Sequence, residues 1–149
     1  MRIHVDADGC PVKQEIYRVA KRYALEVRVV ANSGVETPVD PRVEMVMVGN
    51  GLDAADDWIV EHAAADDVVV TADIPLAARC VAKGAAVIHP TGRPFNEHDI
   101  GSALAVRDLL KTLRESGQRT RGPAPFTDRD RSQFLQALDG AIQRGRRAR

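Results

Sequence analysis

DVVVTADIPLAARCVAKGAAVIH, residues 67–89, is the stretch that decides the expected fold. Its beginning, Asp67 to Thr71, has the strongest strand pattern in the chain, because three consecutive valines favour β structure. A helical pattern follows from about Ile74 to Lys83 and ends before Gly84. Ala86 to His89 is typical of another short strand. A strand, a helix and a second strand in this order predict a right-handed crossover between parallel strands.

The sequence before residue 67 continues this alternation of strands and helices. Strands are expected over Arg2–Asp6, Glu26–Val30 and Glu44–Val48. One helix is expected from Pro11, and another after Asp53, which is a favourable N-cap residue. We therefore predict an α/β fold with three layers, α/β/α, around a mostly parallel five-stranded sheet in the order 3-2-1-4-5.

The sequence after residue 100 predicts two C-terminal helices, and the whole chain, residues 1–149, is expected to form a single domain. The first helix carries the apolar residues Val106, Leu109, Leu110 and Leu113, and the second carries Phe134, Leu135, Leu138 and Ile142. Residues 116–126 are expected to link the two helices. The arginine-rich end, residues 144–149, is expected to be disordered.

The composition excludes several classes of protein. The chain has 44% hydrophobic and 28% charged residues, which is ordinary for a globular protein. Cys10 and Cys80 are too few for a disulfide framework or a cysteine-based zinc site. No apolar run approaches the roughly 20 residues that a membrane span needs, and no signal-peptide pattern opens the chain. We expect a cytoplasmic protein without a membrane partner.

The charges are distributed unevenly, although the formal net charge is zero. Residues 1–106 contain 10 Lys or Arg and 16 Asp or Glu, whereas residues 107–149 contain 11 and 5. Such asymmetry suggests an acidic centre beside a basic arm. The candidates to bind a nucleic-acid backbone are Arg119, Arg121, Arg129 and Arg131, and pairing with the acidic body is their alternative role.

Acidic side chains are expected to gather at one edge of the sheet. Asp6 and Asp8 follow the first strand, Asp53 and Asp56 follow the third, and Asp73 follows the fourth. The carboxyl ends of parallel strands meet at one edge, where ligands bind beside the switch point between strands 1 and 4. Clustered carboxylates repel one another unless a cation neutralises them. We predict that Asp6, Asp8, Asp56 and Asp73 bind Mg²⁺ or Mn²⁺, which prefer oxygen ligands. Helix capping is the alternative for Asp53 and Asp73.

Five further residues are expected to support this site or to contact substrate, namely Cys10, Lys13, Asn32, Asp53 and Thr71. Cys10 and Lys13 lie at the start of the first helix, where a thiolate is stabilised and a cation can meet a phosphate. Packing of Cys10 and solvation of Lys13 are the alternatives. Asn32 follows the second strand, where it would orient substrate or form a turn.

Four segments resemble the YaiI/YqxD family of uncharacterised bacterial proteins. They are VDADGCPVK at 5–13, GLDAADDWI at 51–59, TADIPLA at 71–77 and GPAPFTDRDRSQFLQALD at 122–139. That family in turn resembles PIN-like nuclease domains. PIN domains place one acid after strand 1, one at the start of the helix before strand 4, and one in a Thr-x-Asp after strand 4. Asp6, Asp56 and Thr71-Ala72-Asp73 hold these places here.

The resemblance implies a PIN-like fold and metal-dependent hydrolysis of phosphodiester bonds, with RNA as the favoured substrate. It implies that Asp6, Asp56 and Asp73 are catalytic. PIN enzymes usually add a glutamate from a helix, for which this sequence offers no clear equivalent, and Asp8 or Asp53 are candidates to replace it. PIN-like domains often pair, so a homodimer is a further expectation.

Two other functions remain open. Asp6-Ala7-Asp8 fits the first motif of phosphatases of the haloacid dehalogenase type, with Asp6 as nucleophile and Asp8 as general acid. The order of the later motifs differs, because the acidic pair Asp56-Asp57 comes before Thr71. The other alternative is a non-catalytic nucleic-acid-binding module with a structural metal. Its weakness is the low aromatic content of 4%, since single-strand binders stack bases on aromatic rings.

Overall fold

The structure, a computed structural model, describes residues 1–49, 51, 53–98, 100–101 and 125–147. The strands in these residues are β1 (Arg2–Asp6), β2 (Glu26–Ala31), β3 (Val43–Met47), β4 (Val68–Val70), β5 (Ala86–Ile88) and β6 (Pro94–Phe95). The helices are α1 (Lys13–Tyr23), α2 (Ala54–His62), α3 (Ile74–Ala82) and α5 (Asp128–Arg147).

The strands form one sheet in the order β3-β2-β1-β4-β5-β6. The first five strands of this order are parallel, with Ile3 of β1 opposite Val27 of β2 on one side and Val68 of β4 on the other. The predicted order 3-2-1-4-5 is thus confirmed. The short strand β6 is an addition, and it pairs antiparallel with β5. The sequence did not predict β6, because the strand has only two residues and the first is Pro94, a residue that is rare in strands.

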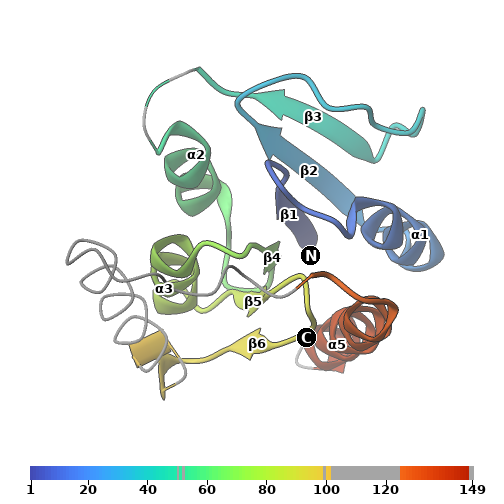
Figure 1. Cartoon of the computed structure of the whole chain (residues 1–149), viewed down its shortest axis with the longest axis vertical. Coiled ribbons are helices and arrows are strands. Elements are labelled where there is room, and N and C mark those ends of the chain that lie inside the picture. The colour runs from blue at the N-terminus through green and yellow to red at the C-terminus, as the bar shows by residue number, and fades with distance from the viewer. Residues whose placement is uncertain (50, 52, 99, 102–124, 148–149) are drawn as a thin grey trace.

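Helices cover both faces of the sheet, as predicted (Figure 1). On one face, Ile3 and Val29 pack with α1 and α5, whose fully buried side chains include Ile16 and Phe134. On the other face, Val69 packs with α2 and α3. Neighbouring residues of a strand face opposite ways, so valine-rich strands supply apolar side chains to both layers. The result is the α/β/α architecture.

The C-terminal region differs from the expectations in one respect. Residues 144–147 belong to α5, so the prediction of a disordered end is wrong for them. The side chain of Arg146 explains part of this order, because it donates to the backbone carbonyl of Tyr23 at 2.6 Å and lies over the tyrosine ring. The predicted helix with Val106 to Leu113 and the linker up to residue 124 lie outside the described residues. No helix in the described part of the chain has the length and apolarity that crossing a membrane requires.

Candidate functional site

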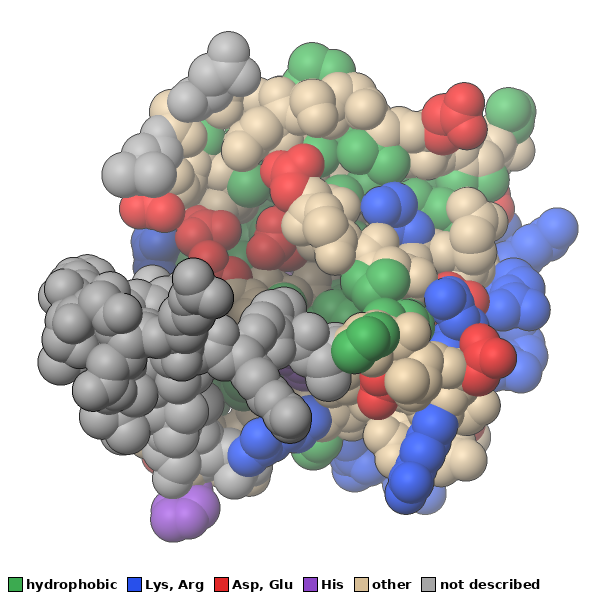
Figure 2. Space-filling view, viewed as in Figure 1, with side chains coloured by type: hydrophobic (Ala, Val, Ile, Leu, Met, Phe, Trp, Pro, Cys, Tyr) green, Lys and Arg blue, Asp and Glu red, His purple; other side chains and the backbone are tan. Residues whose placement is uncertain are grey.

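A pocket of about 390 Å³ lies at the carboxyl edge of the sheet. The predicted site residues that line it are Asp6, Asp8, Cys10, Asn32, Asp53, Asp56 and Asp73. Figure 2 shows acidic side chains gathered on this side of the molecule, between α2 and the ends of β1 and β2. The strand order places β1 beside β4, and the structure therefore brings acids from three separate segments to one pocket.

Thr71 links the carboxylate of Asp6, the last residue of β1, to the backbone of Asp73, which follows β4. Its hydroxyl donates to Asp6 Oδ2 at 2.8 Å and accepts the backbone N–H of Asp73 at 2.9 Å. Thr71 is buried, with 1% of its surface exposed. The carboxylate of Asp73 in turn accepts the backbone N–H of Leu76 at 3.0 Å and caps α3. Asp73 therefore has the capping role that the sequence allowed, and it lines the pocket as well.

The pocket disfavours negative charge on two of its acids. Burial raises the pKa of Asp6 above its ordinary value; the hydrogen bond from Thr71 opposes this shift, and the charge of Asp73 adds to it. Burial also raises the pKa of Asp56 to about 6, and the charges of Asp73 and Asp6 add to the shift. Carboxylates that repel one another in this way are stabilised as anions by a cation placed between them.

Asp53 does not cap α2 with its side chain, contrary to the capping prediction. It precedes Ala54, the first residue of the helix, but its backbone has φ 62° and its side chain makes no cap hydrogen bond. This left-handed conformation is uncommon for a residue other than glycine. With its carboxylate released from capping, Asp53 lines the pocket and adds to the negative charge that acts on Asp56.

The acids supply suitable ligand atoms for Mg²⁺ or Mn²⁺ but do not yet surround a common point. As the side chains lie, no group of three or more His, Cys, Asp or Glu residues among those described is arranged to hold a metal ion. Asp6 and Asp73 each use one carboxylate oxygen in the hydrogen bonds given above, and a carboxylate has two. The donor chemistry fits a hard divalent cation, and the geometry requires side-chain rotation before three carboxylates could meet one.

The loop between β1 and α1 forms one wall of the pocket. Asp8 accepts the backbone N–H of Asn32 through Oδ2 at 3.1 Å, which ties this loop to the end of β2. Lys13 donates to the carbonyl of Cys10 at 3.0 Å, so its ammonium braces the loop. Burial raises the pKa of the Cys10 thiol, which favours the packing role over a reactive thiolate.

The predicted backbone-binding arginines do not reach this pocket in the described residues. Arg131 pairs with Glu15 at 2.7 Å, which is the alternative role that the sequence allowed. Arg129 lies exposed on α5. Arg119 and Arg121 lie outside the described residues. Glu15 is a buried helix glutamate that pairs with Arg131 and does not line the pocket.

Sequence reasoning did not single out Pro90 or Arg79, which lie beside the acids. Pro90 lines the pocket because β5 ends next to β4. Arg79 pairs with Asp57 at 2.9 Å, and its charge lowers the pKa of Asp56 against the larger effect of burial. Arg79 lies in α3, six residues after Asp73, and this spacing does not predict a contact with Asp57. Arg79 comes near Asp57 only because α3 packs beside α2.

Comparison with known proteins places the chain in a family. A family model described as "Uncharacterized BCR, YaiI/YqxD family" matches residues 4–144. The UPF0178 protein of Nitrobacter winogradskyi is 57% identical over 148 residues, which cover 99% of this chain and 94% of that protein. The UPF0178 protein of Bradyrhizobium diazoefficiens is also 57% identical, over 99% of this chain and 89% of its own length. No solved structure matches significantly. The chain belongs to the YaiI/YqxD family, which confirms the resemblance seen in its sequence motifs.

Proposed function

We propose that this protein is a metal-dependent phosphodiesterase that cleaves nucleic acid, with RNA as the favoured substrate. One observation carries the proposal: acids from three segments distant in sequence line a single pocket, and two of them have a raised pKa. Structural acids are usually dispersed or paired with cations, because uncompensated carboxylates in one pocket destabilise the fold. Perturbed groups that cluster in a cleft are typical of functional sites.

The residues have distinct roles in this proposal. Asp6, Asp8, Asp56 and Asp73 would hold Mg²⁺ or Mn²⁺, and Asp6, Asp56 and Asp73 match the PIN-like pattern. When bound, the ion supplies a nucleophilic water and stabilises the charge that develops on phosphate oxygens. Thr71 orients Asp6, and its hydrogen bond to the backbone of Asp73 fixes the start of α3.

Cleavage assays test the proposal directly. End-labelled single-stranded and hairpin RNA and DNA are incubated with Mn²⁺ and the parent, Asp6→Asn or Asp73→Asn. Asparagine keeps the acceptor oxygen for the Thr71 hydroxyl and remains a good N-cap, so both variants should fold. We expect the parent to cleave and each variant to lose at least ~100-fold in rate. Asp57→Asn is the matched control, because Asp57 pairs with Arg79 and does not line the pocket.

Several outcomes would overturn the proposal. They are cleavage that survives chelation, cleavage that both variants retain, and an inert parent. Hydrolysis of p-nitrophenyl phosphate but not of bis-p-nitrophenyl phosphate would instead identify a monoester phosphatase that uses Asp6 and Asp8.

A further inference from the structure

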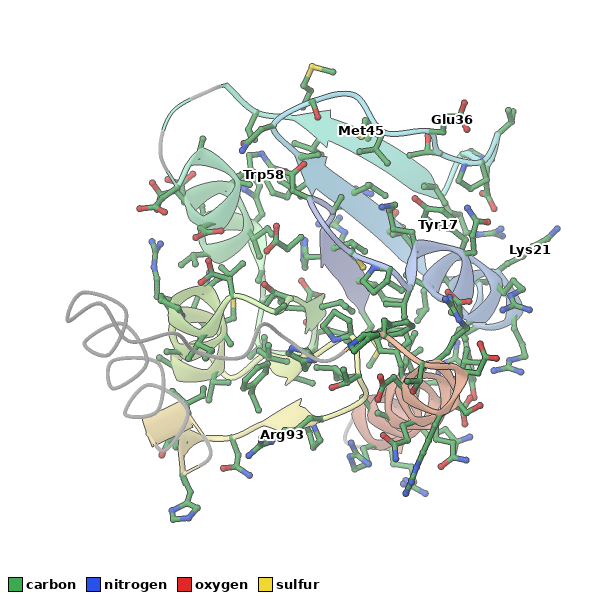
Figure 3. All side chains as sticks on the ribbon, viewed as in Figure 1. Tyr17, Lys21, Glu36, Met45, Trp58 and Arg93 are labelled. Atoms are coloured by element: carbon green, nitrogen blue, oxygen red, sulfur yellow. The ribbon has the colours of Figure 1, made fainter. Side chains whose placement is uncertain are left out.

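A second depression, of about 830 Å³, is lined by residues that neighbour the acidic pocket along the chain. Pro90 lines the acidic pocket, while its neighbours His89 and Thr91 line the second depression. We call this depression the hairpin groove, because one wall is the loop that joins β5 to β6. Its polar lining residues are His89, Thr91, Arg93, Asp130, Gln133 and Gln136. Figure 3 labels Arg93 next to the start of β6.

The two walls of the hairpin groove are held together by direct backbone contact. Gly92 has φ +91°, and a Cβ built on it would lie 2.5 Å from the carbonyl carbon of Gln133 in α5. Only glycine allows the loop to approach the helix this closely. The loop is also closed by hydrogen bonds from the His89 N–H to the Arg93 carbonyl and from the Gly92 N–H to the His89 carbonyl. The groove is therefore a fixed feature of the fold.

His89 lines the groove, and its hydrogen bonds fix the role of one ring nitrogen. Its Nδ1 lies 3.0 Å from the backbone N–H of Thr91, which can only donate, so Nδ1 is the acceptor. A neutral imidazole with Nδ1 as acceptor carries its proton on Nε2. Burial lowers the pKa of His89, the charge of Arg93 adds to the shift and that of Asp130 opposes it, so the net shift favours the neutral ring. The ring therefore has an Nε2–H to donate.

The remaining polar groups complement a nucleotide. Arg93 is exposed and carries a guanidinium that can pair with a phosphate. The exposed amides of Gln133 and Gln136 each offer a donor and an acceptor, as the hydrogen-bonding edge of a base does. The negative charge of Asp130 would repel an anion bound in the groove. However, Asp130 is part of the N-terminal cap of α5, in which its Oδ2 accepts the backbone N–H of Thr127 at 3.0 Å and its own backbone N–H donates to the Thr127 hydroxyl. The helix N-terminus offsets part of its charge.

We propose that the hairpin groove binds the nucleotide next to the bond that is cleaved, on a single-stranded segment of the substrate. In this position Arg93 contacts the phosphate, and Gln133 and Gln136 hydrogen bond to the base. The inference rests on the proposed function for the position of the cleaved bond. A single strand fits because its base edges are free to reach the amides, whereas those of a duplex are paired.

Binding measurements test this groove apart from catalysis. Fluorescence anisotropy with a labelled 12-nucleotide single-stranded RNA, in Ca²⁺ instead of Mn²⁺, gives affinities for the parent, Arg93→Gln and Gln136→Ala. We expect each variant to bind about 5- to 30-fold more weakly. Arg93→Gln should also reduce the salt dependence by about one ionic contact. Lys21→Gln removes an exposed cation far from Arg93 in Figure 3 and should bind as the parent does.

Each result decides between the two proposals. The proposal for the groove is overturned if the parent binds no RNA, or if Arg93→Gln binds as tightly as the parent or as Lys21→Gln. It is also overturned if a duplex of the same sequence binds the parent as tightly as the single strand does. If cleavage depends on Asp6 but RNA affinity is the same with and without Arg93, the proposal for the groove fails and the proposed nuclease function stands. Binding that depends on Arg93 without any cleavage would remove the nuclease and leave the groove as a site for a single-stranded segment that has no cleaved bond beside it.

Discussion

The hydroxyl of Thr71 donates to Asp6 Oδ2 at 2.8 Å, across the boundary between β4 and β1. The same hydroxyl accepts the backbone N–H of Asp73 at 2.9 Å. One buried side chain thus connects the carboxylate of Asp6, at the end of β1, to the backbone of Asp73, at the start of α3. It holds Asp6 in place and partly opposes the rise in the pKa of Asp6 that burial causes.

Replacement of Thr71 by valine should weaken both the fold and the site. Thr71→Val keeps the shape of the side chain but leaves the backbone N–H of Asp73 and an oxygen of Asp6 without this partner. We expect a loss of ~1–3 kcal/mol in the free energy of unfolding and reduced cleavage. Chemical denaturation and the cleavage assay measure the two effects. Thr71→Ser retains the hydroxyl, and equal losses in both variants would show that the hydroxyl is not the reason.

Asp56→Asn should stabilise the protein in the absence of metal. The pKa of Asp56 is raised to about 6 from 3.8, so the folded state binds its proton more tightly than the unfolded state. Stability from this group therefore falls as the pH rises from about 4 to 6 and stays low above 6. At pH 8 with chelator, we expect Asp56→Asn to melt ~2–4 °C above the parent.

Added Mn²⁺ should reverse that order. Mn²⁺ bound by the folded parent raises its melting temperature, and Asp56→Asn should gain much less because it lacks one of the proposed ligands. Differential scanning fluorimetry with and without Mn²⁺ gives both comparisons. An equal gain in the two proteins would remove Asp56 from the metal site.

Because of the buried pair of His4 and Asp67, the stability of the fold should change with pH in the acidic range. Burial by itself raises the pKa of Asp67, but hydrogen bonds from His4 Nε2 and the backbone N–H groups of Ala64 and Arg2 outweigh it and lower the pKa from 3.8 to about 2. A carboxylate whose pKa is lower in the folded state stabilises the fold at any pH above its pKa in the unfolded chain. This contribution is lost as the pH falls through about 2. It amounts to roughly 2 kcal/mol.

Asp67→Asn tests this contribution. We expect the variant to be less stable than the parent at pH 7, and the difference between them to shrink as the pH falls from about 5 to 2. Urea denaturation across this range measures it. Glu61→Gln, which removes an exposed carboxylate on α2, should follow the parent. A constant difference between Asp67→Asn and the parent would contradict the assignment.

Arg131 should matter for the docking of α5 more than for binding nucleic acid. Its partner Glu15 is 4% exposed, and Glu15 Oε2 has no hydrogen-bond partner in the described part of the chain. Arg131→Met would remove the 2.7 Å ion pair of this buried carboxylate and leave the one with Arg18 at 3.6 Å, at a cost of ~1–3 kcal/mol in unfolding free energy. The double variant Glu15→Met, Arg131→Met should recover part of that loss. Arg129→Met, on the exposed side of the same helix, is the control for denaturant unfolding.

Gly92→Ala should separate the loop of the hairpin groove from α5. An added Cβ would approach the backbone of Gln133 and Phe134 to less than 3 Å, at a positive φ. We expect a loss of more than ~2 kcal/mol in stability. Gly9→Ala has a similar φ of +76° but nothing within 4 Å of the new Cβ, so it should cost only the ~1–2 kcal/mol of the strained backbone. Equal losses in thermal unfolding would show that the contact with α5 is unimportant.

The sequence by itself determined the order of the elements and the edge at which the acids gather. Valine-rich strands and amphipathic helices are local patterns, and their alternation predicts a parallel sheet in which Asp6 and Asp73 follow neighbouring strands. These predictions succeeded because each depends only on residues close together in the chain, together with the general handedness of crossovers.

Only the tertiary structure decided how the side chains are used. The pairing of Glu15 with Arg131 joins residues 116 positions apart, and the contact of Gly92 with Gln133 depends on where α5 docks. The release of Asp53 from capping and the burial of the Cys10 thiol likewise follow from packing. The burial of a side chain, the repulsion between two carboxylates and the close approach of two backbones all depend on distances through space. The sequence does not give these distances, because they are set only when the helices pack onto the sheet.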